Sequence, residues 1–100
     1  MPKYVFTYRS PLDAIESDPD SVAPWIAWFG EIKGSIVDLG QPVGESRRVG
    51  SASAETLTGY SVIGADDLDA ALAIAKTCPA IGRGFGVEVG ELIEMDHASL

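Results

Sequence analysis

The sequence holds little of what metal sites and nucleophilic active sites are usually built from. It contains one cysteine, Cys78, and one histidine, His97, among 100 residues. A single cysteine excludes an internal disulfide and fits a reducing compartment. With neither a second imidazole nor a thiolate cluster, zinc-type sites have no ligand set, and we expect no metal and no cofactor.

The two residues themselves favour structural roles. His97 lies close to the C-terminal end, where we expect a surface position, and no Ser-His-Asp or Cys-His arrangement can be assembled without it. Cys78 follows a predicted helix end, where the negative partial charge of the helix raises a thiol pKa. We therefore interpret Cys78 as a packed core cysteine.

Basic residues are also scarce. Seven lysines and arginines stand against fifteen aspartates and glutamates, which gives a formal net charge of −8. An acidic surface repels the phosphates of nucleic acids and of anionic membranes, so we expect neither as a partner. No run approaches the roughly 18 apolar residues of a membrane span. The apolar start of the chain ends at Arg9, too early for a signal-peptide core, and we expect a cytoplasmic protein.

Three segments have the composition of β-strands. They are rich in aromatic and β-branched residues or alternate in polarity, and they cover residues 3–9, 59–65 and 85–94. Both sides of the first are largely apolar, as in a strand that is covered on both faces. Glycines and serines interrupt residues 41–57, where residues 47–49 offer one further short strand.

Two helices separate these strands. Apolar residues at spacings of three and four predict a first helix over residues 22–36. Gly30 and Gly34 lie one turn apart within it, and we interpret them as positions where another backbone packs closely. The second predicted helix follows an N-cap at Asp66. Strand, helix, strand, strand, helix, strand is the order of a ferredoxin-like βαββαβ fold of the α+β class.

This fold has a four-stranded antiparallel sheet with two helices on one face, which leaves the other face open. Yet the first strand is apolar on both of its sides. The natural cover for the second side is another copy of the chain, so the sequence predicts a homodimer.

A series of short motifs runs through nearly the whole chain. They are Lys3–Phe6, Trp25–Phe29, Gly40, Thr58–Ile63, Ala65–Leu72, Ala75, Cys78–Pro79 and Gly86–Val89. In this order they resemble the YCII-related, or DGPF-domain, family of the dimeric α/β-barrel superfamily. The resemblance implies the ferredoxin-like fold, the homodimer, and one domain over residues 1–95, with a tail at residues 96–100.

The sequence departs from the family pattern in two places. The Asp-Gly-Pro-Phe tetrapeptide is absent between Gly44 and Gly59, and residues 23–25 lack the histidine that some members use with an aspartate in the interior cleft. The resemblance therefore does not bring that catalytic pair. Relatives include a dechlorinating enzyme of aromatic breakdown, which implies a lyase or isomerase acting on a small aromatic or lactone-like acid in an intersubunit cleft. The alternative, favoured by the missing histidine, is a non-catalytic ligand-binding or protein-interaction module.

Glu88 is the leading candidate for catalysis. It stands within the last predicted strand, on the side opposite its two valine neighbours. If the valines face the helices, Glu88 faces the dimer interior, where burial would disfavour its charged form and suit it to act as a general base. Tyr60, whose hydroxyl can donate a hydrogen bond, is the second predicted catalytic residue. The alternative for Glu88 is an ion pair with Arg9, Arg47 or Arg48.

Arg47 and Arg48 form the only basic pair of this acidic protein. Arginine grips a carboxylate through two hydrogen bonds, so the pair is predicted to bind a small anionic ligand at the mouth of the cleft. The alternative is that they only hold Glu45 or Glu55.

Aromatic residues are the remaining signal. Tyr8, Trp25, Trp28 and Tyr60 offer flat surfaces and hydroxyl groups to a small aromatic ligand. Trp25 and Phe29 lie on the apolar stripe of the first helix, so core packing is the stronger interpretation for them. Trp28 is off the centre of that stripe, and we expect it to reach the ligand, the dimer partner or the surface.

Overall fold

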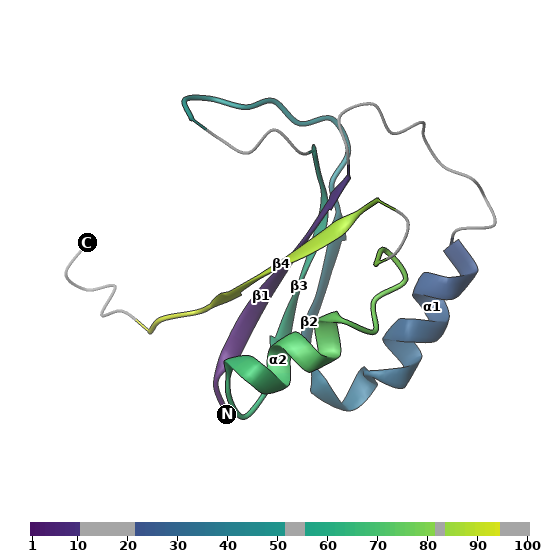
Figure 1. The fold of residues 1–100 in the computed structure, drawn as a ribbon, viewed down its shortest axis with the longest axis vertical. Coiled ribbons are helices and arrows are strands. Elements are labelled where there is room, and N and C mark those ends of the chain that lie inside the picture. The colour runs from purple at the N-terminus through teal and green to yellow at the C-terminus, as the bar shows by residue number, and fades with distance from the viewer. Residues whose placement is uncertain (11–21, 52–55, 82–83, 95–100) are drawn as a thin grey trace.

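The fold follows the predicted order of elements. The computed structural model describes residues 1–10, 22–51, 56–81 and 84–94. Its elements are β1 (Lys3–Ser10), α1 (Val22–Glu31), the 3₁₀ turn η2 (Lys33–Ser35), β2 (Ile36–Pro42), β3 (Thr56–Gly64), α2 (Leu68–Ala75) and β4 (Gly86–Glu91). The strands form one antiparallel sheet in the order β2-β3-β1-β4, with both helices on one face (Figure 1). The ferredoxin-like prediction is confirmed. None of the helices in these ranges has the length and apolar character needed to cross a membrane.

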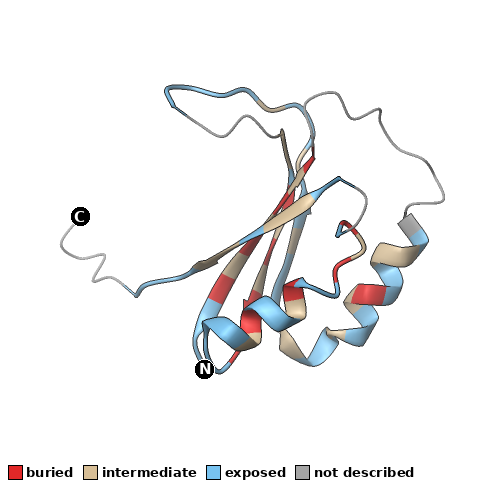
Figure 2. Cartoon of the chain, in the orientation of Figure 1, coloured by how far each residue is buried: buried red, intermediate tan, exposed pale blue. Residues whose placement is uncertain are grey.

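β1 lies at the centre of the structure, between β3 and β4. Its side chains alternate, as a strand requires: Tyr4, Phe6 and Tyr8 are buried beneath the helices, and the residues between them are half-buried on the other side. We call that other side, which neither helix covers, the open face. Buried positions concentrate on the strands and on the inner sides of the helices (Figure 2).

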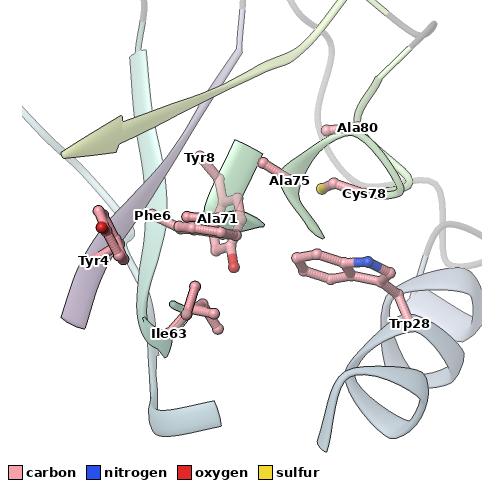
Figure 3. Close-up of a cluster of buried hydrophobic side chains, with 10 residues drawn as sticks. Tyr4, Phe6, Tyr8, Trp28, Ile63, Ala71, Ala75, Cys78 and Ala80 are labelled. Atoms are coloured by element: carbon pink, nitrogen blue, oxygen red, sulfur yellow. The ribbon is translucent and has the colours of Figure 1, made fainter. Parts of the chain in front are cut away.

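Small residues bring α2 close to the sheet. Ala71 and Ala75 are buried, and Cys78 and Ala80 extend the core beyond the end of α2 (Figure 3). α1 contributes Trp28, which is 2% exposed. Its indole Nε1 donates a hydrogen bond to Oγ1 of the exposed Thr77 at 2.7 Å, so the polar edge of the buried ring has a partner at the margin of the core.

The predicted first helix is too long. α1 ends at Glu31, and Ile36 opens a strand rather than closing a helix. The β-branched pair Ile36-Val37 favours a strand, whereas glycines at 30 and 34 weaken a helix by about 1 kcal/mol each. The strand predicted at residues 47–49 is therefore wrong, because β2 takes its place in the sheet and residues 47–49 have no regular structure.

Two smaller expectations are also corrected. A Cβ added at Gly30 or Gly34 would meet nothing within 4 Å, so among the described residues no other backbone packs closely there. The N-cap of α2 is Asp67 rather than Asp66: its carboxylate accepts a hydrogen bond from the Ala70 N–H at 2.8 Å. The predicted tail at residues 96–100 lies outside the described residues.

Gly40 fits β2 against β3 in a way that only glycine allows. Its φ is +78°, and a Cβ there would lie 1.8 Å from the carbonyl oxygen of Tyr60. The Gly40 N–H turns instead to the carboxylate of Asp38, at 2.9 Å, and the register of β2 on β3 shifts between Asp38 and Gln41.

We predict opposite effects of alanine at two glycines. Gly40→Ala combines a left-handed backbone with a clash against backbone, and we expect it to lower the free energy of unfolding by at least about 2 kcal/mol. Gly30→Ala, in a helix with open space around it, should raise that free energy by roughly 0.5–1 kcal/mol. Urea denaturation measures both. A Gly40→Ala protein as stable as the wild type would show that β2 and β3 do not approach in this way.

Candidate functional site

A cavity of about 410 Å³ lies between α1 and the β2–β3 side of the sheet. We call it the α1 pocket. Its lining consists of Tyr8, Trp25, Ile26, Phe29, residues 39–42 and residues 58–61. The volume falls within the range of small-molecule sites, and four separate elements of the chain contribute to its walls.

Aromatic rings hold one another around this pocket. Tyr8 and Trp25 meet edge to face, with their ring centroids 5.0 Å apart and an interplanar angle of 78°. Trp28 stands behind both, at 6.2 Å from Tyr8 and 5.8 Å from Trp25, and Phe29 lies 5.9 Å from Trp25. Edge-to-face contacts of this kind fix ring orientations, so Tyr8 and Trp25 form a preformed wall.

Two hydroxyl groups link three strands beside these rings. Tyr8 Oη donates to Ser61 Oγ at 3.0 Å, and Ser61 Oγ donates to the carbonyl oxygen of Leu39 at 2.7 Å. The link runs from β1 through β3 to β2, and we call it the hydroxyl relay. Burial raises the pKa of Tyr8 to about 12, although its hydrogen bond with Ser61 acts in the other direction. Tyr8 is therefore protonated at neutral pH.

The sequence did not point to Ser61, Thr58 or Leu39 as site residues. Ser61 is completely buried in β3, between neighbours of apolar character. A buried hydroxyl needs a hydrogen-bond partner, so a serine between apolar neighbours inside a strand was the signal available. The Leu39 carbonyl carries no signal, because any residue has one.

The structure separates the predicted aromatic residues. Tyr8 lines the pocket, and Trp25 lines it too, although core packing was the stronger expectation. Trp28 is buried in the core behind them and is not among the lining residues, so its position differs from the exposed or ligand-facing one expected. Tyr60 contributes to the lining, but its register places it opposite Thr7, with the side chains of the open face.

Glu88 also belongs to the open face. It pairs with Thr7 from the β4 side, so Tyr60, Thr7 and Glu88 form one row across three strands. Two strand spacings place Tyr60 and Glu88 roughly 10 Å apart along this row. The Glu88 side chain is 71% exposed, and its Oε1 lies 3.5 Å from Arg9 Nη2. This contact is the ion pair that we considered as the alternative to catalysis.

The two arginines lie away from the pocket. Both are exposed, and neither is among the lining residues. Arg47 forms an ion pair with Glu45 and donates a hydrogen bond to the Ser46 carbonyl at 3.1 Å. This is the contact expected if the pair serves the local chain rather than a ligand; Glu55 lies outside the described residues.

Within the described part of the chain, the remaining reactive residues do not gather into a site. Cys78 is buried, and burial raises the pKa of its thiol to about 11, which disfavours the thiolate at neutral pH. Among the residues that the structure describes, no three histidine, cysteine, aspartate or glutamate side chains cluster in a way that would hold a metal ion. His97 lies outside those residues.

Comparison with known proteins establishes the fold of this chain but not its family. No family model matches the sequence, and no curated protein matches it. Among solved structures, the chain is similar to the 5-chloro-2-hydroxyhydroquinone dehydrochlorinase TftG of Burkholderia phenoliruptrix AC1100, in complex with 2,5-dihydroxybenzoquinone, with a TM-score of 0.68. The match covers 95% of this chain and 97% of that chain at 14% identity. At this identity the similarity establishes the ferredoxin-like fold, and membership of the YCII-related family stays a prediction.

The buried hydroxyl of Tyr8 predicts a pH dependence of stability. The pKa of Tyr8 is raised from 10.0 to about 12, so the unfolded chain releases this proton before the folded one does. The contribution is fully present below pH 10 and is lost as the pH rises towards 12. Between about pH 8 and pH 11 we expect the free energy of unfolding to fall by roughly 1–1.5 kcal/mol more in the wild type than in Tyr8→Phe. Urea denaturation at both pH values measures this, and equal losses would mean that the Tyr8 hydroxyl is solvated.

Proposed function

We propose that this protein binds a small, flat, uncharged ring compound in the α1 pocket. The observation that carries the proposal is the lining itself: mostly aromatic and aliphatic side chains border about 410 Å³, and among the described residues the lining includes no aspartate, glutamate, lysine, arginine or histidine. A carboxylate held against this lining would find no cation among the described residues and would lose part of its hydration. The pocket thus favours the aromatic ligand that the sequence predicted over the anionic one.

The arrangement of the walls supports the same ligand. Tyr8 and Trp25 are already held by edge-to-face contacts and by the hydroxyl relay, so binding costs little ordering of side chains. A flat ring can enter between α1 and the sheet without a change of fold. TftG, whose fold is similar, has been seen with a ring compound, 2,5-dihydroxybenzoquinone.

Titration calorimetry with phenol and with benzoate tests this proposal. We expect phenol to bind and benzoate, an anion of similar size, to bind at least about tenfold more weakly, because the lining offers the carboxylate no partner. Trp25→Ala should weaken phenol binding by roughly 2–10-fold through loss of the aromatic wall. Leu72→Ala, on the exposed side of α2, is the control and should change nothing. Benzoate binding as tight as that of phenol would contradict the proposal.

A second candidate function rests on the open face. Tyr60, Thr7 and Glu88 form their row there, and half-buried Val5 and Val62 form the next row, paired with each other. We propose that a second copy of the chain covers this face, in a homodimer of the dimeric α/β-barrel kind. The cleft between the copies would then hold a small aromatic or lactone-like acid for a lyase or isomerase reaction, with Glu88 as base and Tyr60 as hydrogen-bond donor.

Chloride release from 5-chloro-2-hydroxyhydroquinone, the substrate in the name of TftG, tests this second candidate. If Glu88 is the base, Glu88→Gln should slow turnover by about 10²–10⁴-fold while sedimentation still shows a dimer. Glu91→Gln makes the same chemical change on the same strand, opposite Tyr4 on the helix-covered side, and should leave turnover unchanged. A wild-type monomer that releases no chloride would remove this candidate.

A further inference from the structure

The hydroxyl relay has only one possible direction. The carbonyl oxygen of Leu39 can only accept a hydrogen bond, so Ser61 Oγ, 2.7 Å away, gives it the single hydrogen that a serine hydroxyl has. The contact of 3.0 Å between Tyr8 Oη and Ser61 Oγ must then use the hydrogen of Tyr8. Tyr8 Oη consequently presents only lone pairs to any molecule in the α1 pocket.

A second hydroxyl of the lining is committed in the same way. Thr58 Oγ1 lies 3.0 Å from the backbone carbonyl oxygen of Tyr8 and donates its hydrogen to it. Tyr8, Ser61 and Thr58 all line the pocket, and each gives its hydrogen to the protein. Tyr60, the fourth hydroxyl residue of the lining, belongs to the open face by its register. The hydroxyl groups of the pocket therefore act as acceptors.

We propose that the α1 pocket selects ring compounds that bring a hydrogen-bond donor to Tyr8, as a phenol does, over the same rings with that hydroxyl methylated. The inference rests on the proposed binding function and adds the class of ligand. A phenolic hydroxyl at Tyr8 Oη extends the relay by one member, from ligand to Tyr8 to Ser61 to Leu39. Successive hydrogen bonds in a buried chain strengthen one another, whereas an ether oxygen would meet lone pairs. The hydrogen of Tyr8 is present at neutral pH, which lies far below its pKa of about 12.

Among the described residues of the lining, two other side chains carry donors. They are the indole N–H of Trp25 and the amide of Gln41. Either would favour a ligand that accepts, so a preference for phenol in the wild type alone would not locate its cause. A change at Ser61 identifies the cause of the preference. Removing the Ser61 hydroxyl frees the hydrogen of Tyr8, which can then be donated to an ether, while Trp25 and Gln41 stay as they are.

A second relay of the same kind supplies a matched control. Trp28 Nε1 donates to Thr77 Oγ1, and Thr77 Oγ1 donates to the Ile74 carbonyl at 2.7 Å, at the exposed end of α2. None of these three residues lines the pocket. Thr77→Val therefore breaks an aromatic-to-hydroxyl-to-carbonyl link without changing the groups that a ligand meets.

The experiment is calorimetric titration of phenol and anisole into the wild type, Ser61→Ala, Tyr8→Phe and Thr77→Val. We expect the ratio of phenol to anisole affinity to be roughly 5-fold larger in the wild type than in Ser61→Ala, which corresponds to one net hydrogen bond. Anisole should gain affinity in Ser61→Ala. In Tyr8→Phe the ratio should fall without that gain, because the acceptor is lost, and Thr77→Val should keep the wild-type ratio.

Each other outcome has a definite meaning. An unchanged ratio in a folded Ser61→Ala protein overturns the inference but leaves the pocket as a ring-binding site. If Ser61→Ala does not fold, as circular dichroism would show, Tyr8→Phe decides, and an unchanged ratio there overturns the inference. If the folded wild type binds neither compound, the proposed function falls and the inference falls with it.

Discussion

The hydrogen bond from Tyr8 to Ser61 is the interaction on which the pocket side of this fold depends. It joins the central strand β1 to β3, and the Ser61 hydroxyl passes the link to the Leu39 carbonyl of β2. β2 needs this link, because its register on β3 shifts at two places and its ladder of backbone hydrogen bonds is interrupted there. The ring of Tyr8 also packs edge to face with Trp25, so it joins α1 to the sheet. The α1 pocket is the space that these contacts leave.

The sheet divides the candidate residues into two groups that cannot act together within one chain. Tyr8 lies on the face that the helices cover. Tyr60 and Glu88 lie on the open face, because both pair with Thr7, the neighbour of Tyr8 whose side chain points to the other side of β1. A backbone layer separates the two groups. The described lining of the pocket comes from a single copy, whereas in the open-face row the Glu88 side chain is 71% exposed. Binding in the pocket therefore requires less additional structure than catalysis on the open face.

The sequence predicted the fold well where local pattern and final environment agree. The alternation of buried and half-buried side chains predicted for β1 is present in the structure, because the helices cover one of its faces and strands flank both edges. The sequence pattern misled at Ile36, which fits a helical spacing from Phe29 and Ile32 as well as it fits a strand. There the glycines and the pairing with β3 favoured the strand over the helix. The position of Gly40 against the Tyr60 carbonyl depends on residues 20 apart in the chain, so no local pattern could reveal it.

The site was less predictable than the fold for the same reason. Trp25 and Trp28 are one turn apart, and which of them reaches the pocket depends on the rotation of α1. In the structure Trp28 is the buried ring, and it donates a hydrogen bond to Thr77, just beyond the end of α2. The sequence shows two tryptophans on one side of a helix and a threonine 49 positions after Trp28. It does not show that they meet, so it could not say which ring is core and which is wall.

The chemistry of the pocket follows from where its hydrogens are. Tyr8 holds its proton up to a pKa of about 12, so it cannot act as a general base near neutral pH. Its hydrogen is engaged with Ser61, so it is a poor general acid unless the relay breaks. Among the lining residues no histidine or carboxylate takes over either role, and the sequence lacks the histidine of the YCII pattern at the start of α1. A pocket with fixed rings and committed hydrogens is built to hold a ligand in one orientation. The described groups that we propose for proton transfer, Glu88 and Tyr60, lie on the opposite face of the sheet.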